Sequence, residues 1–262
     1  MIEAFLAGVG ILGPGLPDWP AARRVLARVE PWRAAPPAEP RPESLPPNER
    51  RRGARTARWA IGVAAEALRG SGVAAGEAAA VFASSSGDGE TLAQICEALA
   101  QPAPEMSPTR FHNSVHNAAC GYWSIAAGCS RPAVALCAHD SSFGAALIEA
   151  AAQLAGGERA VLLAAYDLPY PAPLDAARPL GQPLAVALLL CGEERGRTLA
   201  RLRLESASPA QAPAAAPVEP AAFAANPAGR ALPLLACVAR GETAVVRVDL
   251  PGGGALAVTA RP

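Results

Sequence analysis

The stretch PAVALCAHDSSFGAALIEAAAQLAGGERAVLLAA, residues 132–165, decides the fold class of this chain. Residues 134–138 are an apolar run that predicts a buried strand, residues 141–155 are rich in alanine and predict a helix, and residues 160–165 predict the next buried strand. A strand, a helix and a strand in this order form a βαβ unit, in which the two strands run parallel. The chain is therefore predicted to have an α/β fold with a mostly parallel sheet flanked by helices.

Apolar patterns on either side of this unit predict further strands and helices. Before it we expect a strand at residues 4–13, a short helix from Asp18 onward, a longer helix at 55–69, a second strand at 78–83 and a third helix at 90–100. The Ala-rich second half of residues 106–128 also predicts a helix. After the unit, residues 183–191 and 200–205 predict two strands that pair with each other.

The composition changes at residue 206, and this change divides the chain. Residues 206–232 form a tract of Pro and Ala with almost no periodic pattern, which we interpret as a linker or a long loop. Residues 243–260 alternate on both sides of a Gly-rich turn and predict a hairpin. We therefore expect a domain at residues 1–205, the tract, and a carboxyl-terminal hairpin within residues 233–262 that packs on the same domain.

The balance of charge excludes a surface for nucleic acid or an anionic membrane, because 23 basic residues meet 23 acidic ones. No apolar run approaches the roughly 18 residues that a membrane span needs. The chain begins with an acidic stretch that lacks the basic region of a signal peptide, so we expect a cytoplasmic protein. The six Cys residues are scattered without CxxC spacing, which indicates free thiols and not disulfides.

His112, His116 and Cys120 are spaced as metal ligands on one face of a helix would be. A zinc site is one interpretation of this spacing. However, Asn113 stands where a metalloprotease has its general-base Glu, and the other interpretation is that these residues are polar helix-start and interface residues. A phosphate loop at residues 84–89 is not supported, because a Walker loop needs a Lys and this chain has none. We expect no metal and no cofactor.

Residues 117–125, NAACGYWSI, resemble the N-x-A-A-G-H-x-S-I helix of the β-ketoacyl synthases, a family with the thiolase-like fold. Residues 132–151 then run in register with the strand, the nucleophile elbow and the buried helix of that family. The resemblance continues through residues 160–167 and 183–205. It implies the amino-terminal half of a ketosynthase joined to a truncated second half.

The elbow of active members reads T-A-C-A-S-G, and the six matching positions here are Ala138, His139, Asp140, Ser141, Ser142 and Phe143. Asp140 therefore replaces the nucleophilic Cys, and a carboxylate cannot hold an acyl group as a stable thioester. Active members also use two His residues, or a His and an Asn, from their second half to decarboxylate malonyl groups. No His follows residue 139 here, so the resemblance implies a chain without condensing activity.

The family includes inactive chain-length factors that pair with an active β-ketoacyl synthase in type II systems. The resemblance implies this role here, in fatty-acid or polyketide synthesis similar to the aryl polyene pathways. The partners would be the synthase in a heterodimer and, indirectly, an acyl carrier protein, with a homodimer when the synthase is missing. Residues 134–138 would be the pairing strand. The candidates for contact with the partner's acyl tunnel, or for the interface with the partner, are Phe111, His112, His116, Tyr122 and Phe143.

Cys120 leaves an alternative open. Residues 118–120 superficially resemble the elbow of other thiolase-fold enzymes, so the alternative is a stand-alone acyltransferase or hydrolase that uses Cys120. Such a thiolate would also need a base nearby. Acylation by a carrier thioester would separate the two functions, because only the enzyme would become acylated.

Overall fold

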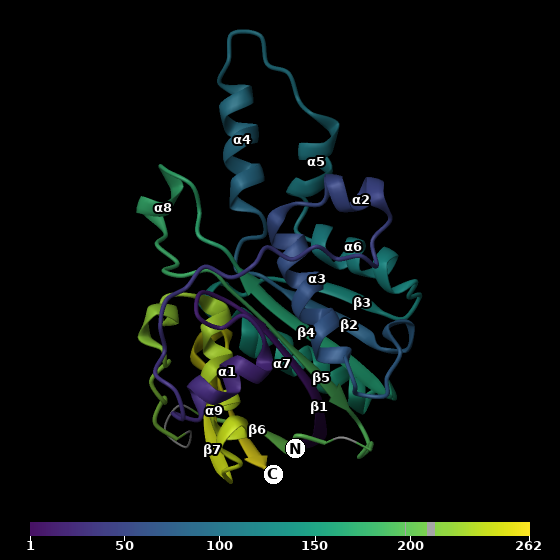
Figure 1. Cartoon of the computed structure of the whole chain (residues 1–262), viewed down its shortest axis with the longest axis vertical. Coiled ribbons are helices and arrows are strands. Elements are labelled where there is room, and N and C mark those ends of the chain that lie inside the picture. The colour runs from purple at the N-terminus through teal and green to yellow at the C-terminus, as the bar shows by residue number, and fades with distance from the viewer. Residues whose placement is uncertain (197, 209–212) are drawn as a thin grey trace.

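An eight-stranded sheet is the centre of the fold (Figure 1). The computed structural model describes residues 1–196, 198–208 and 213–262. The strand order across the sheet is β3-β2-β4-β5-β1-β6-β8-β7. The strands are β1 Ile2–Leu12, β2 Ala79–Ala83, β3 Ala133–Leu136, β4 Ala160–Asp167, β5 Leu184–Cys191, β6 Ala200–Ala207, β7 Ala244–Asp249 and β8 Ala255–Arg261.

The pairing of the strands differs in part from the prediction. β2 runs parallel to β3 and to β4, as the βαβ unit requires, but the other neighbouring pairs are antiparallel. The sheet is therefore mixed, and the expectation of a mostly parallel sheet is wrong. The predicted pairing of residues 183–191 with 200–205 is also wrong, because β1 lies between β5 and β6. Periodicity identifies a strand but not its neighbours.

Nine α-helices within the described residues surround the sheet. They are α1 Trp19–Leu26, α2 Pro47–Arg52, α3 Arg55–Leu68, α4 Gly89–Leu99, α5 Pro108–Ser114, α6 Ala118–Ala127, α7 Ser142–Ala155, α8 Leu174–Ala177 and α9 Leu232–Arg240. None of these helices is long and apolar enough to cross a membrane.

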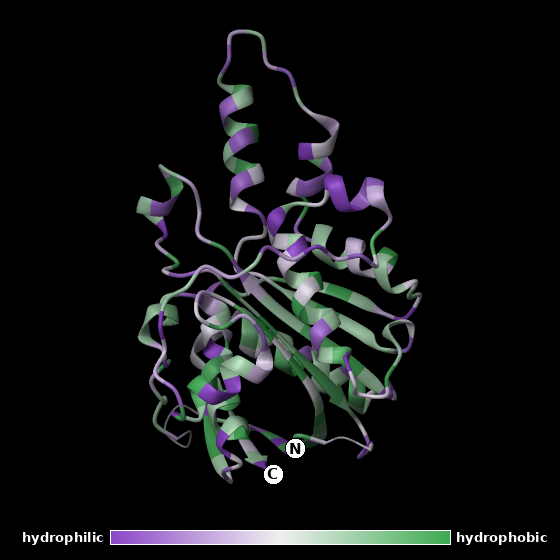
Figure 2. Ribbon diagram, viewed as in Figure 1, coloured by the Kyte–Doolittle hydropathy of each residue, from purple (hydrophilic) through white to green (hydrophobic). Residues whose placement is uncertain are grey.

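Both faces of the sheet are covered, so β4 and β5 are buried along their whole length and are largely apolar (Figure 2). α3 and α6 pack on one face, while α1, α7 and α9 pack on the other. Successive residues of β4 point to the two sides: Val161 and Leu163 pack in the core with α7, and Leu162 and Ala164 pack in the core with α3. Each core thus takes every second residue of the strand.

α4, residues 100–107 and α5 form an arm that extends away from the sheet (Figure 1). Asp88 fixes the base of this arm. Its Oδ1 accepts a hydrogen bond from the backbone N of Thr91 at 2.6 Å and caps α4, while its Oδ2 accepts one from the Thr56 hydroxyl of α3 at 2.6 Å. Asp88 therefore attaches the α4 end of the arm to the body.

The carboxyl-terminal part of the chain contains more structure than its sequence indicates. Residues 221–223 and 227–231 form short 3₁₀ helices, and Phe223 is fully buried against the sheet. α9 follows and was not predicted, whereas the predicted hairpin is confirmed, because β7 pairs with β8. Residues 209–212 of the predicted tract lie outside the described residues. The division of the chain at 205 and 232 stays a prediction, and β8 pairs with β6 within the same sheet.

Two glycines let α3 approach β1 closely. A Cβ atom at Gly8 would lie 1.8 Å from the carbonyl oxygen of Ala67, and one at Gly10 would lie 2.0 Å from that of Val63. Both clashes involve helix backbone, which cannot rotate away as a side chain can. The predicted strand at 4–13 therefore needs its glycines for packing and not for a turn.

We predict that Gly8→Ala lowers the free energy of unfolding by about 2 kcal/mol, because α3 must move away from the sheet. Urea unfolding followed by circular dichroism measures this change. Gly121→Ala on α6 is the matched control, since no atom lies within 4 Å of its new Cβ, and it should leave stability unchanged or slightly increased. Equal midpoints for Gly8→Ala and the unmodified chain would show that the contact is not tight.

Candidate functional site

The turn between β3 and α7 forms an elbow at the carboxyl end of the parallel strands. β3 ends at Leu136, and residues 139–141 form one 3₁₀ turn before α7 begins. His139 has a positive φ of 51°, a conformation that a non-glycine residue adopts at few positions. The Ser142 hydroxyl stabilises the turn, accepting from the Ala138 backbone N at 3.0 Å and donating to the His139 carbonyl at 2.7 Å. Asp140 thus lies at the beginning of a buried helix, next to strand ends where α/β sheets bind ligands.

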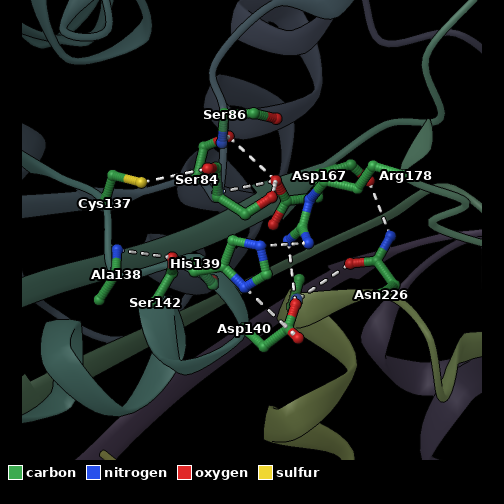
Figure 3. Close-up of polar contacts among 12 residues, drawn as sticks. Ser84, Ser86, Cys137, Ala138, His139, Asp140, Ser142, Asp167, Arg178 and Asn226 are labelled. Carbon is green, nitrogen blue, oxygen red and sulfur yellow. Dashed lines mark hydrogen bonds and ion pairs between the residues drawn. The ribbon is translucent and has the colours of Figure 1, made fainter. Parts of the chain in front are cut away.

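Arg178 reaches this elbow from the segment between β4 and β5 (Figure 3). Its Nη2 donates to Asp140 Oδ1 at 2.9 Å, and its Nη1 lies 2.6 Å from His139 Nε2. A guanidinium can only donate, so His139 Nε2 is the acceptor in this contact. His139 Nδ1 lies 3.5 Å from Asp140 Oδ2. The three side chains therefore form one closed charged cluster.

The elbow is open to solvent. The side chain of Asp140 is 55% exposed and that of His139 70%, whereas that of Arg178 is 23% exposed. A reacting group at this position would therefore stand in water and not at the base of a closed tunnel. The ion pair between Asp140 and Arg178 is compatible with this exposure. Both side chains keep part of their hydration, so little desolvation free energy opposes the pair.

Asp167 is the buried acid of the site and lies at the end of β4. Its Oδ1 accepts hydrogen bonds from Ser85 N and Oγ, both at 2.8 Å, and from Ser84 Oγ at 3.1 Å. Burial raises the pKa of Asp167 to about 6, although the serine hydrogen bonds act in the opposite direction. Asn226 Nδ2 donates to the Asp167 carbonyl at 2.9 Å. Asp167 therefore joins the ends of β2 and β4 to the carboxyl-terminal tract.

The candidate metal ligands do not come together. α5 ends at Ser114 and α6 begins at Ala118, so the regular spacing does not continue along one helix. His112 packs edge-on against Tyr122, with ring centroids 5.6 Å apart, and His116 Nε2 lies 3.0 Å from the Ser84 carbonyl. Within the described residues, no group of three His, Cys, Asp or Glu side chains has the arrangement of a metal site. The zinc interpretation is therefore wrong.

Cys120 is buried and badly placed to react. Only 5% of it is exposed, and burial raises the pKa of its thiol to about 11. At neutral pH almost all of this thiol is protonated, and the thiolate is the nucleophilic form. The environment of Cys120 is thus that of a core residue.

The other candidates separate into a surface group and a core group. Phe111 is 63% exposed on α5, and His112 is also exposed, so both are accessible to another chain. Tyr122 is buried and donates its hydroxyl to Asn113 Oδ1 at 3.2 Å, while Phe143 is fully buried. The side chains of Tyr122 and Phe143 thus fill the core of this chain and leave little surface for another chain to contact.

Sequence patterns did not single out Asp167, Arg178 or Asn226 as site residues. A weak signal existed for Asp167, since a carboxylate directly follows a fully apolar strand. Arg178 and Asn226 lie in stretches without any period, and their role depends on contacts across 38 and 59 residues of chain.

We predict that Asp167 makes stability depend on pH. Its folded-state pKa is above that of an unfolded Asp, so the folded chain binds this proton more tightly, and stability falls as pH rises from about 4 through 6. Between pH 5 and pH 8 the loss is about 1 kcal/mol. Asp167→Asn should remove it in urea unfolding, and the exposed Asp175→Asn should not. The same pH dependence in both variants would contradict the burial of the charge.

The chain is similar to known proteins in both sequence and structure. Residues 26–248 match the family model for the β-ketoacyl synthase N-terminal domain. No curated protein sequence matches the chain. A solved complex of the ketosynthase ApeO with its chain length factor ApeC from Xenorhabdus doucetiae contains a similar chain, 25% identical, with a TM-score of 0.74, and the match covers 99% of this chain and 100% of that one.

Two further structures show how the length of this chain compares with others. The ishigamide ketosynthase/chain length factor contains a chain that is 15% identical with a TM-score of 0.75, covering 100% of this chain and 99% of that one. Ketosynthase twelve of the bacillaene polyketide synthase from Bacillus amyloliquefaciens is 13% identical with a TM-score of 0.59, and only 45% of it is covered by 79% of this chain. The family model spans most of the residues of the present chain, so this chain belongs to the β-ketoacyl synthase family.

Proposed function

We propose that this chain is a non-catalytic subunit of the chain-length-factor type. It would pair with an active β-ketoacyl synthase in type II fatty-acid or polyketide synthesis of the aryl polyene kind. The observation that carries the proposal is the elbow, where Asp140 is bound by Arg178 at 2.9 Å in place of a thiol. The end-to-end similarity to chains of two solved complexes of a ketosynthase with a chain length factor supports it.

The groups at the elbow are unsuited to condensation. Arg178 neutralises Asp140, and it also takes up His139 Nε2, so this His has no free nitrogen facing the elbow for a developing enolate. Cys120 supplies no alternative nucleophile, since burial keeps it protonated. A partner would therefore have to provide the thiol and the histidines.

β3 and the arm are the surface that we assign to this partner. β3 is an edge strand that pairs only with β2 within the described residues, so its other edge is free to accept a strand. The arm adds exposed apolar side chains: Leu92 is 48%, Leu99 54% and Phe111 63% exposed. Obligate subunits bury apolar surfaces of this kind. A homodimer through the same surface is expected when the synthase is absent.

We predict that the chain co-elutes with an active β-ketoacyl synthase of the same organism when the two are co-expressed. Phe111→Asp should weaken this association at least about tenfold, because a carboxylate would enter an apolar interface. Val245→Asp is the matched control: Val245 is 51% exposed on β7, at the opposite edge of the sheet. Size-exclusion chromatography and product analysis measure the result. If the unmodified chain does not co-elute with the synthase, and the synthase makes products of the same length with and without it, the proposed role is wrong.

We predict that Asp140→Cys gives a reactive thiol but no condensation. The position is exposed, lies at the beginning of α7 and faces Arg178, and these features favour a thiolate. Mass spectrometry should show acylation by an acyl carrier thioester, and Arg178→Ala in the same background should slow it about tenfold. Decarboxylation of a malonyl carrier should stay absent. Decarboxylation by this variant alone would contradict the requirement for a partner's histidines.

A further inference from the structure

The segment between β4 and β5 crosses the elbow without belonging to the sheet. We refer to residues 168–183 as the strap. It contains the short helix α8, and most of its residues are exposed. In Figure 1, α8 lies away from the sheet, near the base of the arm. A segment with so little buried surface needs specific contacts to keep one position.

Two contacts connect the strap to elements that the proposed interface depends on. A Cβ atom at Gly89 would lie 2.1 Å from the ring of Tyr170, so this ring packs directly on the first residue of α4. At the other end of α8, Arg178 binds His139 and Asp140 of the elbow. The strap thus contacts the base of the arm with one side chain and the elbow with another.

The hydrogen bonds of Arg178 are the principal attachment. Across residues 170–180 of the described chain, these are the only hydrogen bonds to residues outside the strap. Beyond them, Leu180 is buried and the Gln182 carbonyl accepts from Asn226 Nδ2 at 2.9 Å. The strap is therefore fixed near β5, while the stretch with α8 depends on Arg178.

The charges around Arg178 leave Asp140 as its counter-ion. Asp167 is the other carboxylate facing Arg178, and its Oδ1 is already occupied by the serine hydrogen bonds. Asn226 is neutral and binds backbone carbonyls. His139 Nε2 offers an uncharged acceptor. Without Asp140, a guanidinium that is only 23% exposed would lose the carboxylate that accepts its hydrogen bond.

We propose that Asp140 is a positioning residue: with His139 it binds Arg178 and holds the strap, and through Tyr170 the base of α4, in one arrangement. The residue at the nucleophile position would then have exchanged a chemical role for a structural one. A Cys replaces it poorly, because its single sulfur is a weak hydrogen-bond acceptor, whereas a carboxylate offers two strong acceptor oxygens to Arg. This proposal concerns the chain alone and does not depend on a partner.

Hydrogen exchange of the full chain, read by mass spectrometry, tests the proposal. Asp140→Asn and Arg178→Gln should each speed exchange across residues 170–180 and the first turn of α4 about fivefold, the upper range for an exposed ion pair. Asp175→Asn removes an exposed carboxylate of the strap that forms no ion pair with the described part of the chain, and it should change nothing. The exchange of β5 in every variant shows whether the fold is intact.

A charge exchange separates anchoring from local damage. Asp140→Arg combined with Arg178→Asp rebuilds an opposite-charge pair, so exchange of the strap should return toward the rate of the unmodified chain, whereas Asp140→Arg alone should give the fastest exchange. Unchanged strap exchange in both Asp140→Asn and Arg178→Gln, with β5 still protected, would overturn the proposal. Co-elution with the synthase is measured separately, so a failed anchor and a failed partner role remain distinguishable.

Discussion

The position of the site depends on the close packing of α7 against several strands of the sheet. One side of α7 packs on β2 and β4, where Phe143, Ala146 and Leu147 are fully buried. On another side, a Cβ at Gly144 would lie 2.2 Å from the carbonyl oxygen of Asp249, so β7 touches the helix directly. A helix held this closely cannot tilt or slide. The turn that precedes it, with Asp140, is therefore fixed in space.

The sequence predicts the elements of this fold well and their neighbours poorly. An apolar run and an Ala-rich stretch have the same meaning wherever they occur, so the βαβ unit and the terminal hairpin follow from pattern alone. Pairing depends on contacts between distant segments. β1 comes first in the chain and inserts between β5 and β6. The hydrophobic periodicity of residues 1–13 does not indicate which strands β1 will pair with. The same reason explains why α9 was missed: its preceding tract is irregular, although Phe223 anchors it.

The sequence likewise indicates some residues of the site and not others. Asp140 stands out because it occupies one position of a short local motif, and the structure places it at the turn between strand and helix. Its partner Arg178 lies on an exposed strap, where an Arg in an irregular stretch resembles any other surface charge. Tyr122 and Phe143 are buried, which the motif did not indicate, because a motif assigns positions but not burial. Whether a side chain faces a partner or the core is decided by helices that pack from elsewhere in the chain.

Exposure at the elbow limits the chemistry that its side chains can support. Preorganised groups stabilise an enolate mainly where water is excluded, because the low dielectric strengthens each interaction. Here more than half of the Asp140 side chain is exposed, so water would screen such groups even if a thiol and histidines were present. The same exposure suits an ion pair, whose desolvation cost is small when one partner stays wet. A carboxylate bound to Arg178 is thus the kind of residue that an open elbow can use.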